Sequence, residues 1–321
     1  GWVSCILGDF ETATARSQEG RALHEMLGNE RGVAVALNNL GWAATFQGDF
    51  ERARELHAQG LRLRESVRDR RGVAYARSNL GWVLRGEGRF DDAASHLEEA
   101  LGVLRSLHDD QLTAWELLHR GQVHHDLGEI DRAQALLEES RSLWQAVGNR
   151  TGLCWTLVVL GHVLRRRDRL TEARSRSVEG LGMARAISHR WGTAAGWCGV
   201  GWLELAQGRL EAAEDALVNS LDGRLAMSDR AGLAECLDLL AEIEARRLEW
   251  ARAACSLVGV ERLRERLSAP RPPVDRVRHE GLLERAKGEL GSRFEGIWKR
   301  DTDPVDLAQG WLSQRRARPA S

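Results

Sequence analysis

Four histidines carry the side chains best suited to metal chemistry, namely His119, His124, His125 and His162. Imidazole nitrogens bind zinc and related metals where several of them converge. The His-x-x-x-His spacing and the cysteine-rich spacing of a built metal site are both absent from this sequence. We therefore expect no metal site, and we interpret the histidines as polar residues of a binding surface.

A second set of residues combines aromatic rings with arginine, histidine and asparagine. Its members recur at intervals of three and four residues, which places each group on one face of a helix. The groups are Val35, Asn38, Trp42 and Thr45; Tyr75, Ser78, Trp82 and Arg85; Trp115, Leu118, Gln122 and His125; Trp155, Val158, His162 and Arg165; and Ala195, Cys198, Trp202 and Leu205. Such an aromatic stripe suits an extended peptide or a partner helix. The alternative, that the tryptophans pack between neighbouring helices, stays open at this stage.

Arginines offer a third kind of chemistry. The run from Arg165 to Arg169 lies at the end of a predicted helix, where the helix dipole favours cations. We expect a solvated turn there. The alternative is that Arg85 and Arg165 dock an acidic partner or a phosphate group.

Signals for catalysis are missing. The sequence has no Gly-x-Ser-x-Gly elbow, no HExxH pair and no glycine-rich phosphate loop. Adjacent carboxylates such as Glu98 and Glu99 recur on predicted solvated helix faces. We expect that the chain is not an enzyme and needs no cofactor.

The composition of the 321 residues is that of a foldable, soluble chain, with 43% hydrophobic and 29% charged residues. A formal charge of -1 gives no basic field, so we expect no direct binding of nucleic acid. The five cysteines lack CxxC spacing and are expected to be buried thiols in a reducing compartment. With no leader peptide and no membrane-spanning run, we expect a cytoplasmic protein, and the excess of arginine over lysine indicates a GC-rich bacterial source.

All these residues follow one fixed interval, which is the spacing between Gly1 and Gly41. The row of positions that shows it best holds Gly1, Gly41, Gly81, Gly121, Gly161, Gly201 and Ala241. Further along each copy lie Ala13, Ala53, Ala93, Ala133, Ala173, Ala213 and Ala253. Between these two rows come Gly8, Gly48, Gly88, Gly128, Asp168, Gly208 and Leu248. A period held without insertion over this length predicts a repeat array.

Each copy of the repeat predicts two helices. In the second copy, residues 33–42 have helical apolar spacing, and Gly48 is suited to end that helix in a left-handed conformation. Residues 49–63 then predict the second helix, which begins with acidic residues. Gly41 and Ala53 are expected where the two helices cross most closely, because larger side chains there would cause overpacking.

We expect the array to span residues 1–268, with about seven copies of which the first is truncated. Gly1 falls in the middle of a predicted helix, so the natural chain is expected to continue upstream. Prolines after residue 269 break the frame. Residues 269–321 are then expected to form a helical capping segment over the last hydrophobic face, followed by a frayed tail at 315–319.

The motif Leu37-x-x-Leu40-Gly41-x-x-Ala44, followed by Ala53-x-x-x-His57, resembles the tetratricopeptide (TPR) signature. The interval from Gly41 to Gly81 is longer than the roughly 34 residues of the common type, and the closing proline is missing. Both departures imply longer helices or linkers. The resemblance implies an all-α fold, a TPR-type α-solenoid in which helix pairs form a right-handed superhelix. It also implies that the first helix of each pair lines a concave groove, so that the aromatic stripe becomes a groove for a ligand or partner.

The C-terminal part resembles the C-terminal arm of large bacterial signal-transduction ATPases of the STAND type, such as the LuxR-type large ATP-binding regulators. The residues that carry this resemblance are Ala254-x-x-Leu257-Val258-Gly259, Pro272-Pro273 and Arg293-Phe294-x-x-x-Trp298. It implies a sensor arm of a multidomain regulator of signalling or transcription, with an ATPase module upstream. The chain itself contains no nucleotide-binding loop.

These resemblances imply that a peptide, a protein segment or a small-molecule inducer enters the groove and shifts the curvature of the arm. Such a shift requires that the ligand bind two states of the arm with different affinities. One alternative is a stand-alone TPR adaptor that scaffolds other proteins. Another is self-assembly through the incomplete first repeat.

Overall fold

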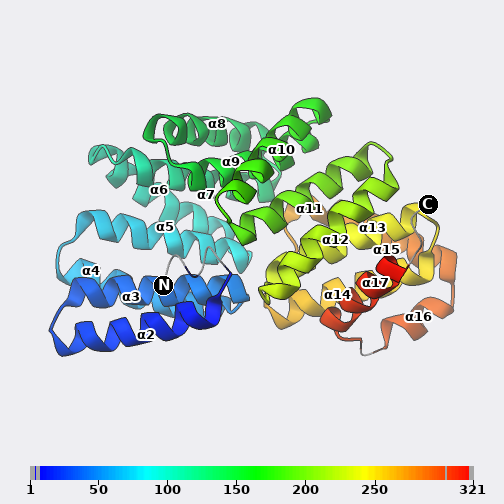
Figure 1. Ribbon diagram of the computed structural model, residues 1–321, viewed down its shortest axis with the longest axis horizontal. Helices are drawn as coiled ribbons and strands as arrows, with labels where there is room; N and C mark the ends of the chain where they lie inside the picture. The colour runs from blue at the N-terminus through cyan, green and yellow to red at the C-terminus, as the bar shows by residue number, and fades with distance from the viewer. Residues whose placement is uncertain (1–3, 5–7, 301, 318–321) are drawn as a thin grey trace.

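The computed structural model describes residue 4, residues 8–300 and residues 302–317. Helices and short turns account for this part of the chain, which contains no strand (Figure 1). The helices are α2 (Phe10–Met26), α3 (Glu30–Gln47), α4 (Phe50–Ser66), α5 (Arg70–Gly86), α6 (Phe90–Ser106), α7 (Asp110–Leu127), α8 (Ile130–Val147), α9 (Arg150–Arg166), α10 (Leu170–Ala186), α11 (Arg190–Ala206), α12 (Leu210–Ala226), α13 (Arg230–Arg246), α14 (Trp250–Arg266), α15 (Pro273–Leu290), α16 (Arg293–Trp298) and α17 (Pro304–Ala317). The predicted all-α solenoid of consecutive helix pairs is confirmed.

The first helix of each pair begins with a side-chain cap that recurs once in every repeat. In α3 and α5, for example, Asn29 and Asp69 accept hydrogen bonds from the backbone N–H groups of Gly32 and Gly72. The equivalent caps of α7, α9, α11 and α13 are Asp109, Asn149, His189 and Asp229. Each cap satisfies one of the backbone N–H groups that a helix start leaves without a partner, and so fixes where the first helix begins.

Left-handed residues end the helices in two rows. The prediction for Gly48 is confirmed, and its equivalents in the other copies also have positive φ, namely Gly8, Gly88, Gly128, Asp168, Gly208 and Leu248. A second row lies half a repeat away and contains Gly28, Arg68, His108, Gly148, Ser188, Ser228 and Ser268. Most members of this second row are not glycine, so residue type gave no sign of it. Each helix of the array therefore ends in the same way.

The expected close crossing within each pair is also confirmed. A Cβ atom added at Gly81 would lie 3.2 Å from the carbonyl oxygen of Ala93, and one at Gly161 would lie 3.3 Å from that of Ala173. The repeated alanines from Ala13 to Ala253 are fully buried. Because the backbones approach this closely, a larger residue in the glycine row would force the helices apart.

Successive pairs curve around an inner face. The first helices of neighbouring pairs touch one another from α5 through α13, whereas no contact of that extent joins successive second helices of the described chain. We call the side lined by the first helices the inner face. The curvature is strong enough that α13 contacts α3 and α15 contacts α7.

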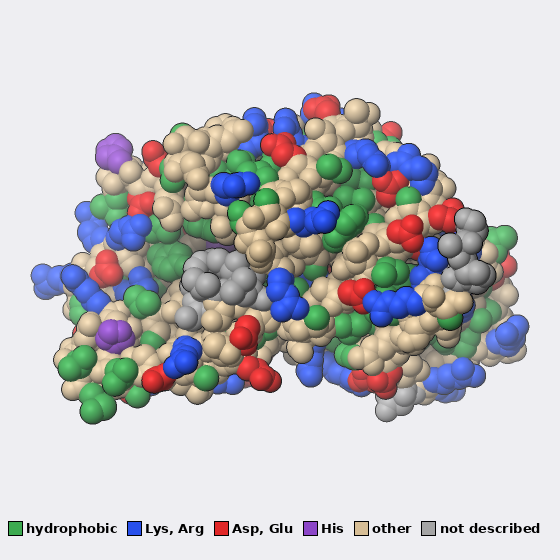
Figure 2. All heavy atoms as spheres, viewed as in Figure 1, with side chains coloured by type: hydrophobic (Ala, Val, Ile, Leu, Met, Phe, Trp, Pro, Cys, Tyr) green, Lys and Arg blue, Asp and Glu red, His purple; other side chains and the backbone are tan. Residues whose placement is uncertain are grey.

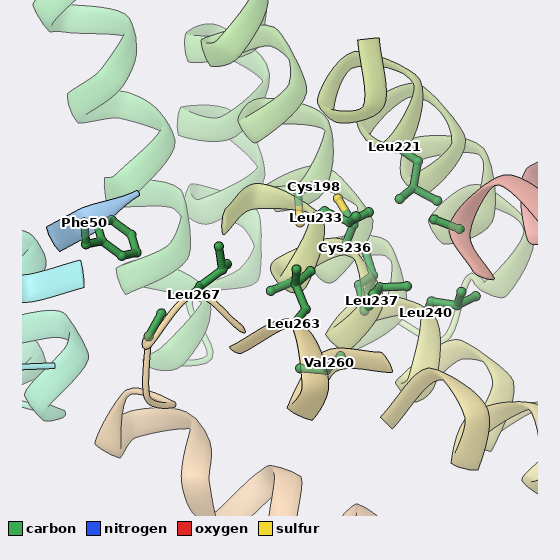
Figure 3. Packing of buried hydrophobic residues seen from close by; sticks show 14 of the residues in the cluster. Phe50, Cys198, Leu221, Leu233, Cys236, Leu237, Leu240, Val260, Leu263 and Leu267 are labelled. Atoms are coloured by element: carbon green, nitrogen blue, oxygen red, sulfur yellow. The ribbon is translucent and has the colours of Figure 1, made fainter. Parts of the chain in front are cut away.

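The end of α14 returns to the start of the array. Leu267 belongs to the same buried cluster as Phe50, and both lie close together in Figure 3. Leu267 also packs on Gly48, and Pro270 packs on Gly88. A segment from the far end of the array in sequence thus closes one side of the inner face.

The C-terminal helices cover hydrophobic surface of the last pairs. Leu282, Phe294 and Ile297 of α15 and α16 pack on Trp250 and Leu257 of α14. On the other side, Trp311 and Leu312 of α17 join the main core cluster.

The expectation of a frayed tail from residue 315 is wrong for the described residues. Arg315 and Arg316 continue α17 as far as Ala317. Arg315 pairs with Glu214 at 3.0 Å, and Arg316 pairs with Asp222 at 2.6 Å. Carboxylates on α12 therefore hold this end of the helix, while residues 318 and 319 lie outside the described part.

Three cysteines, Cys154, Cys198 and Cys236, are buried free thiols, and Cys255 is partly buried. Cys5 lies outside the described residues. Among the described helices, none is both long and apolar enough to span a membrane. Basic and acidic side chains are interspersed over the face shown in Figure 2, so no single-sign patch marks that face.

Candidate ligand site on the inner face

Six aromatic rings meet in the middle of the inner face and form what we call the aromatic wall. Its members are Trp42, Phe46, Trp82, Trp115, Trp155 and Trp191. The ring centroids of Trp155 and Trp191 lie 4.4 Å apart in a stacked pair, and those of Trp82 and Trp155 lie 6.0 Å apart. Because the rings come from α3, α5, α7, α9 and α11, the wall fills the centre of the superhelix.

Packing within the aromatic wall leaves little of the predicted tryptophan side chains exposed. Trp42, Trp82 and Trp155 retain only 4%, 8% and 3% of their accessible surface. Trp115 and Trp202 are partly buried. Burial of a large ring contributes several kcal/mol of apolar stabilisation. Trp42, Trp82 and Trp155 therefore pack as core in this conformation while facing the inner side.

One side of the wall is an open cavity of about 360 Å³. It is lined mainly by the N-terminal and middle parts of α3, α5 and α7, by the start of α9 and by Arg64 of α4. Six of the predicted stripe residues line it, namely Val35, Asn38, Trp42, Tyr75, Trp115 and Trp155. Its rim is accessible, since Val35 is 53% exposed and Arg71 and Gln111 are also exposed.

Carboxamide groups give the open cavity its polar character. Asn39, Asn79, Gln111 and Asn149 line it together with Asn38. Asn79 donates a hydrogen bond to Asn38 Oδ1, while Asn79 Oδ1 is buried and has no hydrogen-bond partner in the described chain. A carboxamide offers both a donor and an acceptor, which matches the polar groups of a peptide bond.

The other side of the wall is a covered cavity of about 140 Å³, with an adjoining space of about 160 Å³. The stripe residues Arg85, Gln122, His125, Val158, His162, Arg165, Ala195, Cys198 and Trp202 line the covered cavity. Thr45 and Trp82 line the adjoining space together with Arg85 and Gln122. Pro272, Asp275 and Arg278 close the covered cavity from the C-terminal segment.

The remaining stripe residues line neither cavity. Ser78 is buried, and its hydroxyl oxygen lies 3.0 Å from the Nδ1 atom of His119. Leu118 is fully buried against the aromatic wall. Leu205 belongs to the main core cluster.

Most of the arginines around the covered cavity form ion pairs. Arg85 pairs with Asp126 at 2.7 Å, and Arg264 pairs with Asp238 at 3.3 Å. Asp275 pairs with both Arg166 and Arg278, and these two guanidinium groups hold the pKa of its carboxyl below the usual range even though burial opposes this. Within the run from Arg165 to Arg169, Arg167 pairs with Asp131 and Arg169 pairs with Glu172.

Arg165 differs from its neighbours, because no carboxylate of the described chain lies within ion-pair distance of it. Its guanidinium lies over the ring of Trp202, 5.2 Å from the centroid. Burial, together with the positive charges of Arg166 and Arg278, lowers the pKa of Arg165 to about 10. The covered cavity therefore holds one cation without a matching anion.

The histidines do not converge. His124 bonds Glu129 at 2.7 Å, and His125 bonds Asp126 at 3.1 Å. Burial lowers the pKa of His119 and of His162 to about 3, so both rings are neutral near pH 7. The described residues contain no group of three or more side chains placed to hold a metal ion.

Several lining residues were not in the predicted stripe. Asn79 directly follows the stripe position Ser78, and Arg64 lies on α4, the preceding second helix. Helical spacing could have suggested Asn79. Pro272, Asp275 and Arg278 lie beyond the end of the array in sequence. No local pattern places them on the inner face, because their position depends on how far the whole superhelix curls.

Comparisons with known proteins agree with this architecture. One family model described as tetratricopeptide repeat matches residues 3–66 and 110–186, and a second with the same description matches residues 73–110. Together the two cover more than half of the sequence. The chain belongs to the tetratricopeptide repeat proteins. The comparison with curated protein sequences gave no match.

Several solved structures share the fold. A Rap protein complexed with competence and sporulation factor is 11% identical with a TM-score of 0.65, and the similarity covers 98% of this chain and 99% of that one. The apo form of RapI is 12% identical with a TM-score of 0.57, covering 88% and 98%. BtubC from P. vanneervenii is 18% identical with a TM-score of 0.51, covering 68% and 90%. At these identities the similarity concerns the fold alone.

Proposed function

We propose that this TPR solenoid binds an extended peptide or protein segment in the open cavity of its inner face. A TPR solenoid is suited to protein–protein interaction, and the open cavity is where this chain exposes apolar and carboxamide groups together. Val35 is half exposed in that cavity, next to Tyr75 and Trp115. The observation that carries the proposal is the exposed rim of this carboxamide-lined cavity, where Val35 is 53% exposed and Gln111 is also exposed.

The fold similarity supports a ligand on this architecture. The Rap protein that resembles this chain over nearly its full length was solved with competence and sporulation factor bound. A complex of that kind shows that a helical array of this size and curvature accommodates a ligand. For this chain we propose a peptide or protein segment, and a small-molecule inducer is the alternative that the same cavity admits.

We further propose that the chain is the sensor arm of a multidomain bacterial regulator with an ATPase module. The support is the C-terminal sequence resemblance. Trp298 of that motif stacks on Phe294, with ring centroids 5.4 Å apart. A ligand that bound one curvature of the arm more tightly would shift the population of the two states. A natural reading frame that encodes a phosphate-binding loop together with this chain would support this role, and a frame without such a loop would favour the adaptor.

Peptide binding is tested with two variants, each of which changes a valine with about half of its surface exposed. A fluorescent random-peptide library is selected on the full chain, and the affinity of one selected peptide is measured for Val35→Arg and Val178→Arg. Val178 is 50% exposed and lies on α10, a second helix. We expect Val35→Arg to weaken binding at least tenfold, because a charged side chain obstructs the cavity, and Val178→Arg to leave it unchanged. Equal affinity of both variants would refute binding in the open cavity.

A further inference from the structure

Arg165 is a cation in a cavity whose other arginines are paired. It projects from the last turn of α9 among Arg85, Arg166, Arg264 and Arg278, each of which has a carboxylate partner. Arg165 has no such partner within ion-pair distance among the described residues; burial and the charges of Arg166 and Arg278 lower its pKa, and only the charge of Asp275 and the thiol of Cys198 oppose them. A buried charge without a partner is costly unless something else compensates it.

A second unsatisfied group lies in the same cavity. The Gln122 side chain is only 7% exposed, and its Oε1 atom is buried without a hydrogen-bond partner in the described chain. A half-turn of the amide would present two N–H donors in place of that oxygen. Trp202 forms one side of the cavity, with the guanidinium groups of Arg165 and Arg278 at 5.2 Å and 4.2 Å from its ring centroid.

We propose that the covered cavity binds an oxyanion, a carboxylate or phosphate group, through the Arg165 guanidinium and the Gln122 amide. The guanidinium fork matches either group with two parallel hydrogen bonds. This inference deepens the proposed function, and the peptide part of it rests on that function. The carboxylate is supplied by an acidic side chain or by the C-terminus of the bound segment, and a free phosphate is the other source.

The size of the cavity limits the ligand. A volume of about 140 Å³ corresponds to the space of roughly five water molecules at about 30 Å³ each. That space holds one carboxylate or phosphate group. Pro272 and Asp275 line the cavity from the C-terminal segment.

The test compares Arg165→Met with Arg169→Met in the full chain. Arg169 is exposed and pairs with Glu172 three residues away. Melting temperature and tryptophan fluorescence are followed while inorganic phosphate or acetate replaces chloride at constant ionic strength. We expect phosphate to raise the melting temperature of the wild type and of Arg169→Met, because an anion that binds the folded state stabilises it. Arg165→Met is expected to lose this response.

The variant also has an expected effect without any added anion. Removal of a partly buried, unpaired charge that is repelled by Arg166 and Arg278 should raise the melting temperature of Arg165→Met by about 2–4 °C in chloride. Identical phosphate responses of wild type and Arg165→Met would overturn the proposal, and so would a wild type that responds to neither anion.

Peptide binding separates this proposal from the proposed function. Selected peptides that carry an acidic residue or a free C-terminus are compared with their amide counterparts. We expect the acidic form to bind at least tenfold more tightly to the wild type and equally to Arg165→Met. If the peptides bind but charge makes no difference, the peptide part fails while the proposed function stands. If phosphate binds at Arg165 but no peptide does, the anion site stands and the proposed function fails.

Discussion

The two cavities of the inner face are built from different parts of the same first helices, and they differ in lining and charge. The open cavity is lined mainly by the N-terminal and middle parts of the first helices and has the half-exposed Val35 at its rim. The covered cavity is lined mainly by their C-terminal halves and is closed by Pro272, Asp275 and Arg278. The repeat therefore provides the walls of both cavities, whereas the non-repeated segment after α14 contributes lining residues to the covered cavity alone among these two.

The largest expected effect concerns the wall between the cavities. Trp155 is 3% exposed and contacts rings from four helices, and its indole Nε1 atom lies 2.8 Å from the Nε2 atom of His189. Trp155→Ala should cost about 3–5 kcal/mol of unfolding free energy, because it leaves a large void between both cavities. The partly buried Trp202 lines only the covered cavity, and Trp202→Ala should cost less. Urea unfolding measures the loss of unfolding free energy in each variant. An equal loss would mean that the aromatic wall is not a core shared by the two cavities.

The closure of the covered cavity should depend on Asp275. This carboxylate joins Arg166 of α9 to Arg278 of α15. Asp275→Asn leaves both guanidinium groups without their shared partner and should cost about 2–3 kcal/mol. The matched control is Asp131→Asn, since Asp131 pairs with Arg167 but is 82% exposed, and such exposed pairs contribute little. Similar melting temperatures for the two variants would show that the C-terminal segment is not held by this charge pair.

Two buried groups of the inner helices should respond to pH in opposite directions. Burial raises the pKa of Glu116 on α7 to about 8, whereas burial lowers that of His162 in the covered cavity to about 3. A raised carboxyl pKa means that stability is lost as pH rises from about 4.5 to about 8, by about 1.4 kcal/mol per pH unit for one proton. A lowered histidine pKa means that stability is lost as pH falls from about 6.5 towards about 3.

Two variants test this pair of slopes. Glu116→Gln should reduce the loss of unfolding free energy between about pH 4.5 and about pH 8. His162→Gln should reduce the loss between about pH 6.5 and about pH 3. In each case the slope changes by the contribution of one proton. Denaturant unfolding across the acid and alkaline ranges measures both. A variant that shifts the whole curve without changing its slope would show that its group does not titrate in the folded state.

Local features of the fold could be predicted from the sequence because they repeat. The left-handed ends at Gly48 and its equivalents and the close approach of Gly81 to Ala93 follow from residue type at a fixed interval. The second row of left-handed residues could not be found in this way, since Arg68 and Ser188 adopt the conformation without being glycine. There the turn is imposed by the packing of the helices on both sides.

The candidate site could be predicted only in part. Helical spacing placed Trp42, Trp82 and Trp155 on the inner face, and they do lie there. Spacing cannot tell how strongly an array curves, and the strong curvature brings the rings of α3 and α9 together. For the same reason the contact between Arg166 and Asp275, two residues far apart in sequence, had no local signal.

The most direct test of the central claim is a crystal structure of the full chain with one peptide selected from the random library. We expect the peptide in the open cavity between Val35, Tyr75 and Trp115. A peptide bound on the second helices, with the open cavity empty, would contradict the claim that the inner face is the ligand site.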